Sequence, residues 1–475
     1  MGRTKIVATI GPASRDPEVM KNMIEAGLDA VRLNLSHGTL EEHLEVIELS
    51  KQLSNSMKAS LATIVDTKGP EIRGIPAWSD TMAATRGEKV LLIPKSRESE
   101  VQGSPALVID WPPLHRHVQK GTRVLLGDGE LELKVRDVKE GIIHCEAQNE
   151  GQITGRKAVT IPNIDLSQPT LTEQDKKNLE RIIPKGIDWI SLSFVKDAQD
   201  IQKARELVEE CHQDGDQPLL IAKIETAQAV ENIDEIVCEA DGLMVARGDL
   251  GMSTDLDELP FTQKKIISLA NSSAKPVITA TQMLESMIKA PSPTRAEVTD
   301  VANAVLDGTD ALMLSAETAT GAHPVETVRT MYRISTKAET HEMGVKIPNE
   351  ELEKIAGIAP AIGRSACEVA KGLDAKAIIT STRSGYTARL ISRFRPHVRI
   401  VAVTPSSTVF HQLSLVWGVH PLRIQVAGNT DQMIERSIEK TRKEGLIVKG
   451  DLVVVTAGIP FAEKGTTNLI KVERV

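Results

Sequence analysis

The chain has 475 residues, which favours two or three domains, and its 41% hydrophobic and 26% charged residues are typical of an ordinary globular protein. A net charge of −8 and an aromatic content of 2% argue against nucleic-acid partners and against binding to an anionic membrane. Because the chain shows four scattered cysteines, no apolar signal-peptide core and no run of transmembrane length, we expect a cytoplasmic protein with reduced thiols.

Eight segments share one pattern, a short apolar strand with a polar tip, followed by a helical stretch. They are residues 5–12, 30–38, 59–74, 189–195, 218–226, 242–251, 276–284 and 311–318. The first strand is followed by a predicted helix around residues 17–26. Eight such units form a (β/α)8 barrel. The sequence therefore predicts an α/β protein built on a TIM barrel.

The spacing of the polar tips reveals an insertion. Ser36 and Asp66 are one unit apart, but the gap from Asp66 to Ser193 is about 90 residues longer than one unit needs. The extra stretch is β-rich and polar, and "GTRVLLGDGELELKVRDV" is typical of a hairpin. We expect residues 74–160 to form a small β-barrel lid domain, inserted into a catalytic barrel made of residues 1–73 and 161–344.

After about residue 345 the alternation of strands and helices restarts, which predicts a C-terminal open α/β domain over 345–475. In "TSTRSGYTAR" several hydroxyl groups and a glycine precede a predicted helix. Such a loop suits a phosphate group, but ordinary N-capping by Ser384 or Thr387 is favoured from these residues alone. We expect the arginines that follow this loop to lie on a solvated surface, although they could assist a phosphate site. They are Arg389, Arg393, Arg395 and Arg399.

Polar side chains recur at the ends of five predicted barrel strands, and in each strand they lie two residues apart. The groups are Arg32, Asn34 and Ser36; Lys223 and Glu225; Arg247 and Asp249, where a turn would break the alternation; Thr279 and Thr281; and Ser315 and Glu317. Residues two apart on a strand share a face, and active sites of such barrels lie at the C-terminal mouth. For a single strand we favour hydrogen-bonded structural polar groups, but buried charges on several strands need a function.

This set of residues suits phosphoryl transfer. Glu225 and Asp249, on adjacent strands, are the kind of carboxylate pair that Mg²⁺ prefers. Lys223 adds a point charge for a phosphoryl oxygen, while Arg32 and Arg73 add planar donors. The glycines of "RGDLG" would let backbone N–H groups approach a ligand. A second, all-oxygen cluster suits a monovalent cation and consists of Asn34, Ser36, Asp66 and Thr67. No P-loop and no dinucleotide fingerprint is present, so a nucleotide would bind without these motifs.

Several motifs resemble, in order, the signature sequences of pyruvate kinases. They are "KIVATIGPAS", "VRLNLSHG", "DTKGPEIR", "KIE", "MVARGDLG", "ATQMLESM", "PTRAEVTDVANAVLDGTDALMLSAETATG" and "GTTNLIKV", and they run from residue 5 to the C-terminal end. The resemblance implies a glycolytic enzyme that transfers the phosphoryl group of phosphoenolpyruvate to ADP, giving pyruvate and ATP. It also implies Mg²⁺ (or Mn²⁺) and K⁺ as cofactors, allosteric control and a homotetramer.

The resemblance also implies roles for matching residues. Lys223 would stabilise the phosphoryl group in flight and Arg32 would bind the phosphate, while Thr281 would deliver the proton through water linked to Ser315 and Glu317. The substrate carboxylate and enolate would lie at Ala246, Arg247, Gly248, Asp249 and Thr281. Mg²⁺ would bind Glu225 and Asp249, and K⁺ would bind Asn34, Ser36, Asp66 and Thr67, with Glu71 linked to K⁺ dependence. Arg73 and His37 would face the nucleotide. A sugar-phosphate or nucleotide effector would bind near Ser381, Thr382, Ser384, Gly385 and Thr387.

Three positions depart from the family pattern. Gln174 replaces a lysine expected near the nucleotide, Gly127 replaces an aspartate of the lid, and Glu42 stands where tyrosine is common. These departures bear on nucleotide affinity and lid closure, and they leave the residues of phosphoryl transfer in place.

Two alternatives follow from the same residues. "KIETAQAVENIDEI" also resembles metal-dependent aldolases that act on pyruvate or oxaloacetate, but such an enzyme needs neither "DTKGPEIR" nor a lid. A sensor that had kept the fold and lost turnover would be expected to lack Lys223, Glu225 or Asp249, and all three are present.

Overall fold

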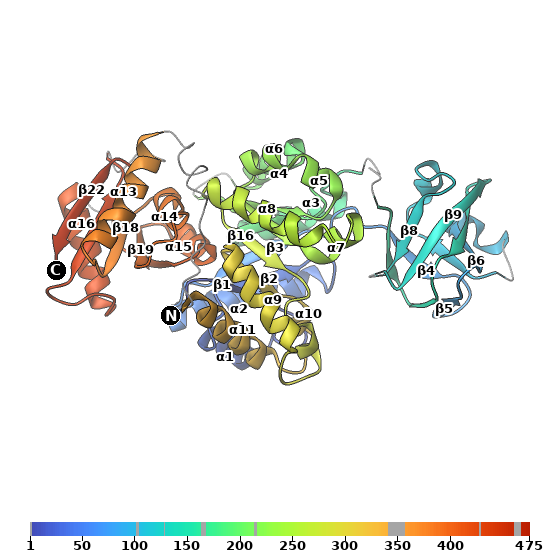
Figure 1. The fold of residues 1–475 in the computed structure, drawn as a ribbon, viewed down its shortest axis with the longest axis horizontal. Coiled ribbons are helices and arrows are strands. Elements are labelled where there is room, and N and C mark those ends of the chain that lie inside the picture. The colour runs from blue at the N-terminus through green and yellow to red at the C-terminus, as the bar shows by residue number, and fades with distance from the viewer. Residues whose placement is uncertain are drawn as a thin grey trace.

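The computed structural model describes residues 2–100, 104–127, 129–162, 168–212, 216–340, 357–426, 429–459 and 467–475. Three bodies lie in a row along its longest axis (Figure 1). A parallel barrel occupies the centre, an all-β body lies at one end, and an α/β body lies at the other. Within the described residues, no helix combines the length and the hydropathy that crossing a bilayer requires.

Eight parallel strands close the central barrel, so the predicted TIM barrel is confirmed. In order around the barrel they are β1 (Lys5–Thr9), β2 (Ala30–Asn34), β3 (Ala62–Asp66), β13 (Trp189–Leu192), β14 (Leu219–Ile224), β15 (Gly242–Ala246), β16 (Val277–Ala280) and β17 (Ala311–Leu314). Each strand lies within one of the eight segments predicted from the sequence. Side chains alternate faces as expected: in β2, Val31 and Leu33 pack in the outer core, whereas Ala30 packs inside the barrel.

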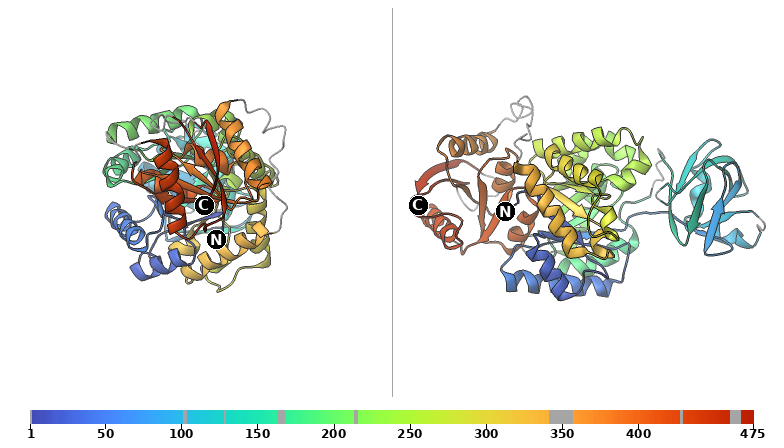
Figure 2. Two further views of the ribbon diagram at one scale, coloured as in Figure 1. Left: turned by 90° about the vertical axis from the view of Figure 1, so that its left-hand side faces the viewer. Right: turned by 60° about the horizontal axis from the view of Figure 1, so that its bottom comes forward.

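Helices surround this barrel, as the end-on view in Figure 2 shows. They are α1 (Pro17–Glu25), α2 (Leu40–Met57), α3 (Glu173–Ile182), α4 (Ala198–Cys211), α6 (Ile233–Glu239), α8 (Leu259–Ser272), α9 (Arg295–Asp307) and α11 (Pro324–Thr340). Shorter pieces are α5 (Ala227–Glu231), α7 (Arg247–Ser253), α10 (Ala316–Ala319), η3 (Ile183–Lys185) and η4 (Glu285–Ile288). Side-chain caps define where several helices begin; in α9 the hydroxyl of Thr294 and the carboxylate of Glu297 cap each other's backbone N–H groups.

The end of β16 corrects one expectation. Ile278 and Ala280 pack inside the barrel, so Thr279 lies on the outer face, where its hydroxyl is 3.0 Å from Thr309 Oγ1. Thr281 follows the strand with a left-handed φ of 68°, which ends the alternation. Thr279 and Thr281 therefore do not share a face.

The inserted segment forms a second closed barrel of seven strands, which confirms the predicted β-barrel lid. These strands are β4 (Arg73–Pro76), β6 (Lys89–Pro94), β7 (Ala106–Ile109), β8 (Arg123–Leu126), β9 (Leu131–Lys139), β10 (Ile142–Ala147) and β12 (Lys157–Thr160). A separate pair consists of β5 (Thr81–Ala84) and β11 (Gly151–Thr154), and two short helices are η1 (Lys95–Glu100) and η2 (Pro112–Arg116). The predicted hairpin is the antiparallel pair β8 and β9.

The C-terminal body is a five-stranded open sheet with helices, as predicted. Its strands are, in sheet order, β20 (Val419–Arg423), β19 (Arg399–Thr404), β18 (Ala377–Ser381), β21 (Leu452–Ala457) and β22 (Leu469–Arg474), the last being antiparallel. Its helices are α13 (Ile358–Gly372), α14 (Tyr386–Ser392), α15 (Ser407–Gln412), η5 (Leu413–Leu415) and α16 (Thr430–Lys443). The predicted start of this domain, residues 345–356, lies outside the described residues.

The C-terminal body closes the base of the barrel, at the N-terminal ends of its strands. Leu415 is fully buried and belongs to the same apolar cluster as Trp189 and Ile64 inside the barrel. The C-terminal end of the barrel is thereby left on the side of the lid (Figures 1 and 2).

Candidate active site

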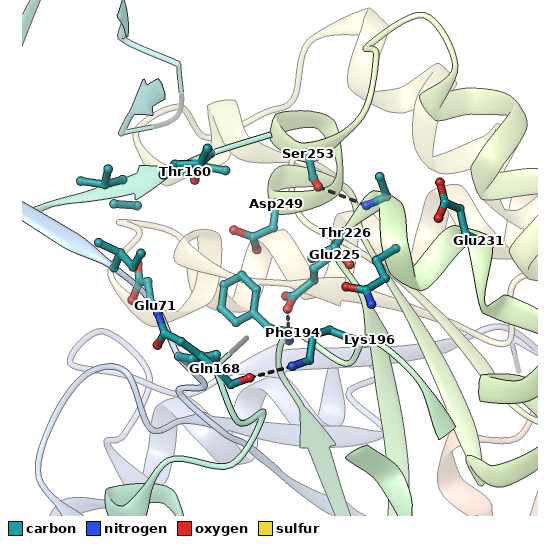
Figure 3. A pocket seen from close by; sticks show the side chains of 17 residues that line it. Glu71, Thr160, Gln168, Phe194, Lys196, Glu225, Thr226, Glu231, Asp249 and Ser253 are labelled. Atoms are coloured by element: carbon teal, nitrogen blue, oxygen red, sulfur yellow. Dashed lines mark hydrogen bonds between the residues drawn. The ribbon is translucent and has the colours of Figure 1, made fainter. Parts of the chain in front are cut away.

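A cavity of about 390 Å³ lies at the C-terminal mouth of the barrel, where the two connections to the lid leave it. Glu71 and Thr160 line it from the lid connections, while Phe194, Glu225 and Asp249 line it from the barrel (Figure 3). Ligand cavities commonly have this size, and TIM-barrel enzymes carry their active sites at this end.

Two of the predicted metal ligands lie in this cavity. Glu225 follows β14 and Asp249 lies in the first turn of α7, and both carboxylates point into the cavity in Figure 3. Glu225 is buried, and its Oε2 accepts a hydrogen bond of 2.7 Å from the backbone N–H of Phe194. Burial raises the pKa of Glu225; the Lys223 ammonium opposes this shift and the Asp249 carboxylate adds to it. The pair is thus a concentrated negative charge that a cation would stabilise.

Lys223 points from β14 into the mouth of the barrel and is buried among oxygen atoms. Its Nζ lies 2.7 Å from Ser193 Oγ, 2.8 Å from Glu225 Oε1 and 3.4 Å from Asp66 Oδ1. Burial alone would lower the pKa of Lys223, but the two carboxylates outweigh it and raise the pKa above its ordinary value. The residue therefore presents a permanent positive charge in a place with little water.

Arg32 and Asp66 form the second buried ion pair of the mouth. Arg32 Nε lies 2.9 Å from Asp66 Oδ2, its Nη2 also contacts that oxygen, and its Nη1 lies 3.0 Å from Thr9 Oγ1. Burial works to raise the pKa of Asp66, but the charges of Arg32 and Lys223 hold it below its usual range. The Asp66 carboxylate, at the end of β3, thus contacts both cations, Arg32 of β2 and Lys223 of β14.

The segment "RGDLG" corrects a second expectation, because it forms the helix α7, so that Arg247 and Asp249 do not share a strand face. Arg247 is anchored by Asp300, whose two oxygens each lie 2.8 Å from its guanidinium, and it also donates to the carbonyl of Thr281. The backbone N–H of Gly248 donates to Thr281 Oγ1 at 2.8 Å. Arg247 and Gly248 therefore position Thr281, while Ala246 ends β15 just before them.

The structure brings together most of the predicted K⁺ ligands. Asn34 and Asp66 are paired residues at the ends of β2 and β3, and Thr67 follows directly. Asn34 Oδ1 accepts a hydrogen bond of 3.1 Å from the N–H of Ser36, and the Thr67 carbonyl accepts one of 2.6 Å from the Ser193 hydroxyl. This is a group of oxygen donors around one carboxylate, the chemistry that suits an alkali-metal ion.

The predicted nucleotide residues lie farther out. Arg73 is half-buried, and its Nε lies 2.8 Å from the Glu71 carboxylate, which itself lines the cavity. His37 is exposed beside β2, and its carbonyl lies 2.8 Å from the ring of His43.

The residues of the predicted proton relay, which was expected to run through water, make the following contacts. Glu317 is buried and accepts hydrogen bonds from the N–H groups of Ser315, at 2.6 Å, and Leu284, at 3.3 Å. Burial raises the pKa of Glu317. The Thr281 hydroxyl donates to the carbonyl of Ala280, and no direct hydrogen bond joins it to Ser315 or Glu317 in the part of the chain that the structure describes.

Two of the three departures from the family pattern have a local structural role. Glu42 is the third residue of α2, where it forms a capping box with Thr39 and an ion pair of 2.8 Å with Arg15. Gly127 has a left-handed φ of 61°, a conformation that disfavours the expected aspartate. Gln174 is exposed on α3 and contacts Asn178.

Helix α14 corrects a third expectation, because Gly385 stands at its N-cap position and no side chain caps it. The reason is that Gly385 adopts a left-handed φ of 76°, so that neither Ser384 nor Thr387 takes the cap position. The hydroxyl of Thr387 instead lies 2.8 Å from that of Thr467, while Ser381 and Thr382 are buried at the end of β18.

Sequence reasoning gave no role to three residues that the site depends on. Ser193 contacts Lys223, Thr9 contacts Arg32, and Asp300 anchors Arg247. Ser193 and Thr9 lie at the ends of strands of the predicted barrel, and this position could have identified them as site residues. Asp300 lies within α9, and nothing in the local sequence pointed to it.

Comparison with known families decides which enzymes this site belongs to. The model of the pyruvate kinase barrel domain matches residues 1–328, and that of the pyruvate kinase alpha/beta domain matches residues 360–473. The chain belongs to the pyruvate kinase family. Curated pyruvate kinases of Sporosarcina psychrophila and Bacillus licheniformis are 41% and 42% identical to it over 476 residues, covering 99% of this chain and 80% of each relative. A crystal structure of a pyruvate kinase from Cryptosporidium parvum matches with a TM-score of 0.92 and 35% identity, covering 100% of this chain and 96% of that one.

The pyruvate kinase resemblance predicted from the motifs is thus confirmed, and with it a transferase that moves a phosphoryl group between phosphoenolpyruvate and ADP. The aldolase alternative is set aside, since both family models are those of pyruvate kinase.

Proposed function

We propose that this pyruvate kinase depends on Mg²⁺ and K⁺, works in the cytoplasm as an allosteric homotetramer, and transfers the phosphoryl group in the cavity at the barrel mouth. The observation that carries the proposed site is the position of Lys223. Its ammonium lies 2.8 Å from Glu225, beside the cavity that Glu225 and Asp249 line. A buried cation next to a pair of carboxylates is what transfer between two anions requires.

The residues present fit both ions. Glu225 and Asp249 would hold Mg²⁺, which takes one or two protein carboxylates and completes its shell with water and substrate oxygens. Bound there, the ion would neutralise charge on the phosphoryl and carboxylate oxygens. Asn34, Ser36, Asp66 and Thr67 would hold K⁺ through oxygen atoms.

The protein's own groups then have separate tasks. Arg32 and Lys223 would bind the phosphoryl oxygens and hold them during transfer. The N-terminus of α7 at Arg247 and Gly248 would orient the substrate carboxylate, next to Thr281. Thr281 would hold the proton that the enolate carbon receives, with Glu317 and Ser315 behind it.

Self-association is supported by apolar surface on the central barrel. Leu256, just before α8, and Phe261, in the first turn of that helix, are 71% and 67% exposed. A nearly apolar groove also runs between α9 and α11 and is lined by Val298, Ala302 and Ile334. Exposed apolar surface of this kind commonly marks a protein interface.

The effector would bind at the loop of Ser381, Thr382, Ser384, Gly385 and Thr387.

The test is pyruvate formation from phosphoenolpyruvate and ADP with Mg²⁺, with and without K⁺, for the wild type and Lys223→Met. Losing a positive charge at the transferring group should lower kcat by at least about a hundredfold. Lys203→Met, on the exposed face of α4, is the matched control and should keep wild-type turnover. A Lys223→Met enzyme with normal turnover would contradict the assignment. An inactive wild type would favour the non-catalytic alternative.

A further inference from the structure

The arginines that follow the effector loop correct a fourth expectation, because they are not a solvated run. Arg393 is only 5% exposed, and the side chain of Arg395 is 7% exposed. Arg389, one turn before Arg393 on α14, is half-buried. Since burying a charge costs free energy unless it is compensated, each of these residues needs a partner.

Arg395 has its partners. Its Nη1 lies 3.1 Å from the Asp310 carboxylate and its Nη2 lies 2.6 Å from Asn271 Oδ1, so the C-terminal body is joined to the base of the barrel. Arg393 has no comparable group. Its Nε and Nη2 are buried, and neither has a hydrogen-bond partner within the described ranges; its guanidinium packs 5.1 Å from the ring of Phe394.

Arg393 lines a recess between the C-terminal body and the barrel base, together with Arg389 and Lys275. Lys275 donates to the carbonyls of Val237 and Cys238, and Arg389 donates to the carbonyl of Ser384 at 3.2 Å. Neither of them forms an ion pair with a described residue. Three cations therefore share one recess, and Asp310, the carboxylate among its described lining residues, is paired with Arg395.

The acidic residues nearby are already paired with other arginines. Asp310, which lines the recess, pairs with Arg395, and Asp241, which lies close enough to Arg389 to affect it, pairs with Arg205 at 3.1 Å. The recess therefore keeps an excess of positive charge. The recess is partly open, and its volume of about 10 Å³ has room for roughly one water-sized group. A large occupant is excluded, whereas one oxygen of a small anion would fit inside.

We propose that this recess binds a small tetrahedral oxyanion, either free phosphate or the phosphate group of a monoester, with Arg393 as its central ligand. An anion oxygen inside the recess would accept from the buried N–H groups of Arg393 that have no partner among the described residues. Lys275 and Arg389 line the same recess and add positive charge. The site is separate from the cavity at the barrel mouth, which lies at the opposite end of the strands.

Occupancy of this recess connects two parts of the molecule. Lys275 belongs to the barrel, just before β16, and Arg393 belongs to the C-terminal body. An anion held by both would strengthen the contact between the two bodies. Arg389 also donates a hydrogen bond to the carbonyl of Ser384 in the predicted effector loop, so this residue connects the recess to that loop.

The test is calorimetric titration of the full-length protein with inorganic phosphate in a buffer free of other oxyanions. We expect Arg393→Gln to weaken phosphate binding at least about tenfold, the loss expected for a charge-assisted hydrogen bond. Lys275→Gln, which alters the barrel side, should weaken it as well and guards against a folding defect in the first variant. Arg364→Gln, which changes an exposed arginine of α13, is the matched control and should bind normally.

Two further comparisons decide where phosphate binds. Lys223→Met reports phosphate at the barrel mouth, and binding that weakens in this variant but not in Arg393→Gln would overturn the proposal. Absence of binding to the wild type would overturn it too. Repeating the titration with methyl phosphate separates the two sources: equal affinity indicates a monoester site, and a preference for inorganic phosphate indicates free phosphate. None of these measurements requires turnover, so they stand apart from the proposed function.

Discussion

At the scale of single residues, the mouth of the barrel is a set of charges that hold one another in place. Lys223 and Arg32 are both buried, and both contact Asp66. Lys223 also contacts Glu225, which burial and Asp249 make harder to ionise. A charge removed from such a network leaves its partners buried without compensation, so activity here should respond strongly to small changes.

Ser193→Ala tests the neutral member of this network. The Ser193 hydroxyl accepts from Lys223 at 2.7 Å and donates to the Thr67 carbonyl at 2.6 Å, so it fixes the position of the ammonium. Losing a hydrogen bond to a charged group costs about 1.5–3 kcal/mol, and we expect kcat to fall by about tenfold or more. Ser191→Ala on the same strand is the control, because the Ser191 hydroxyl has no hydrogen-bond partner within the described ranges. Equal losses in both variants would contradict a specific role for Ser193.

At the scale of elements, the base of the barrel is tied together by a repeated contact. Aspartates stand directly before four strands, and each accepts a hydrogen bond from the first backbone N–H groups of the neighbouring strand. The pairs are Asp29 with Ile6, Asp188 with Thr63, Asp241 with Leu220 and Asp310 with Val277, at 2.8 to 3.0 Å. These carboxylates accept hydrogen bonds from backbone N–H groups near the starts of the strands, which the pairing between strands leaves without a partner.

Asp188→Asn tests how much a charged carboxylate at this buried position lowers the free energy of unfolding. Burial raises the pKa of Asp188 to about 8, against hydrogen bonding from Thr63. Between about pH 4 and pH 8 the folded protein keeps a proton that the unfolded chain releases, so this residue lowers stability as pH rises. Asn keeps the acceptor oxygen without the charge. We expect the variant to match the wild type near pH 4 and to exceed it by about one to a few kcal/mol at pH 8, measured by urea unfolding.

The matched control for this change is Asp241→Asn. Asp241 makes the same backbone contact, but its carboxylate also pairs with Arg205 at 3.1 Å. That variant should lose stability and not gain it, because it leaves the arginine without its partner. A stability curve of Asp188→Asn that runs parallel to the wild-type curve from pH 4 to pH 8 would show that Asp188 does not titrate in this window.

At the scale of the whole molecule, the C-terminal body is joined to the barrel by apolar packing, by hydrogen bonds and by a buried ion pair. Leu415 enters the apolar cluster at the barrel base, and Arg395 lies 3.1 Å from Asp310. Asp310 also accepts from the N–H of Trp417 and from that of Val277, so it joins the two bodies directly. The contact is further specified by hydrogen bonds of Lys5 with the Val419 carbonyl and of Gln412 with the Gln217 carbonyl.

Arg395→Gln tests this contact between the C-terminal body and the barrel. Removing one partner of a buried ion pair costs about 3–5 kcal/mol, so we expect a clearly lower denaturation midpoint, or an early separate transition of the C-terminal body. Arg364→Gln removes an exposed pair with Glu368 on α13 and should cost about 0.5 kcal/mol or less. Adding Asp310→Asn to Arg395→Gln should recover part of the loss, since no unpaired charge is then buried. Equal effects of the two arginine changes would contradict the interpretation.

The barrel, the inserted lid, the open α/β body and the enzyme family could all be predicted from the amino-acid sequence. This was possible because strand periodicity and strand-end residues are local signals, and because a carboxylate or lysine at the end of a parallel strand must reach the same mouth. Lys223, Glu225, Asp249 and Asp66 were found in this way. The departures at Gly127 and Glu42 were visible too, but their structural reasons were not.

The tertiary structure alone decided which of these charges are paired with which. Asp300 reaches Arg247 from a helix 53 positions later, and Asp310 reaches Arg395 from another body. Local sequence cannot show such pairs, because they depend on how separate elements pack. The same reason explains Thr279, which lies on the outer face while Thr281 leaves the alternation after Ala280. It also explains Arg393, whose charge lies in a recess between two bodies and not in solvent.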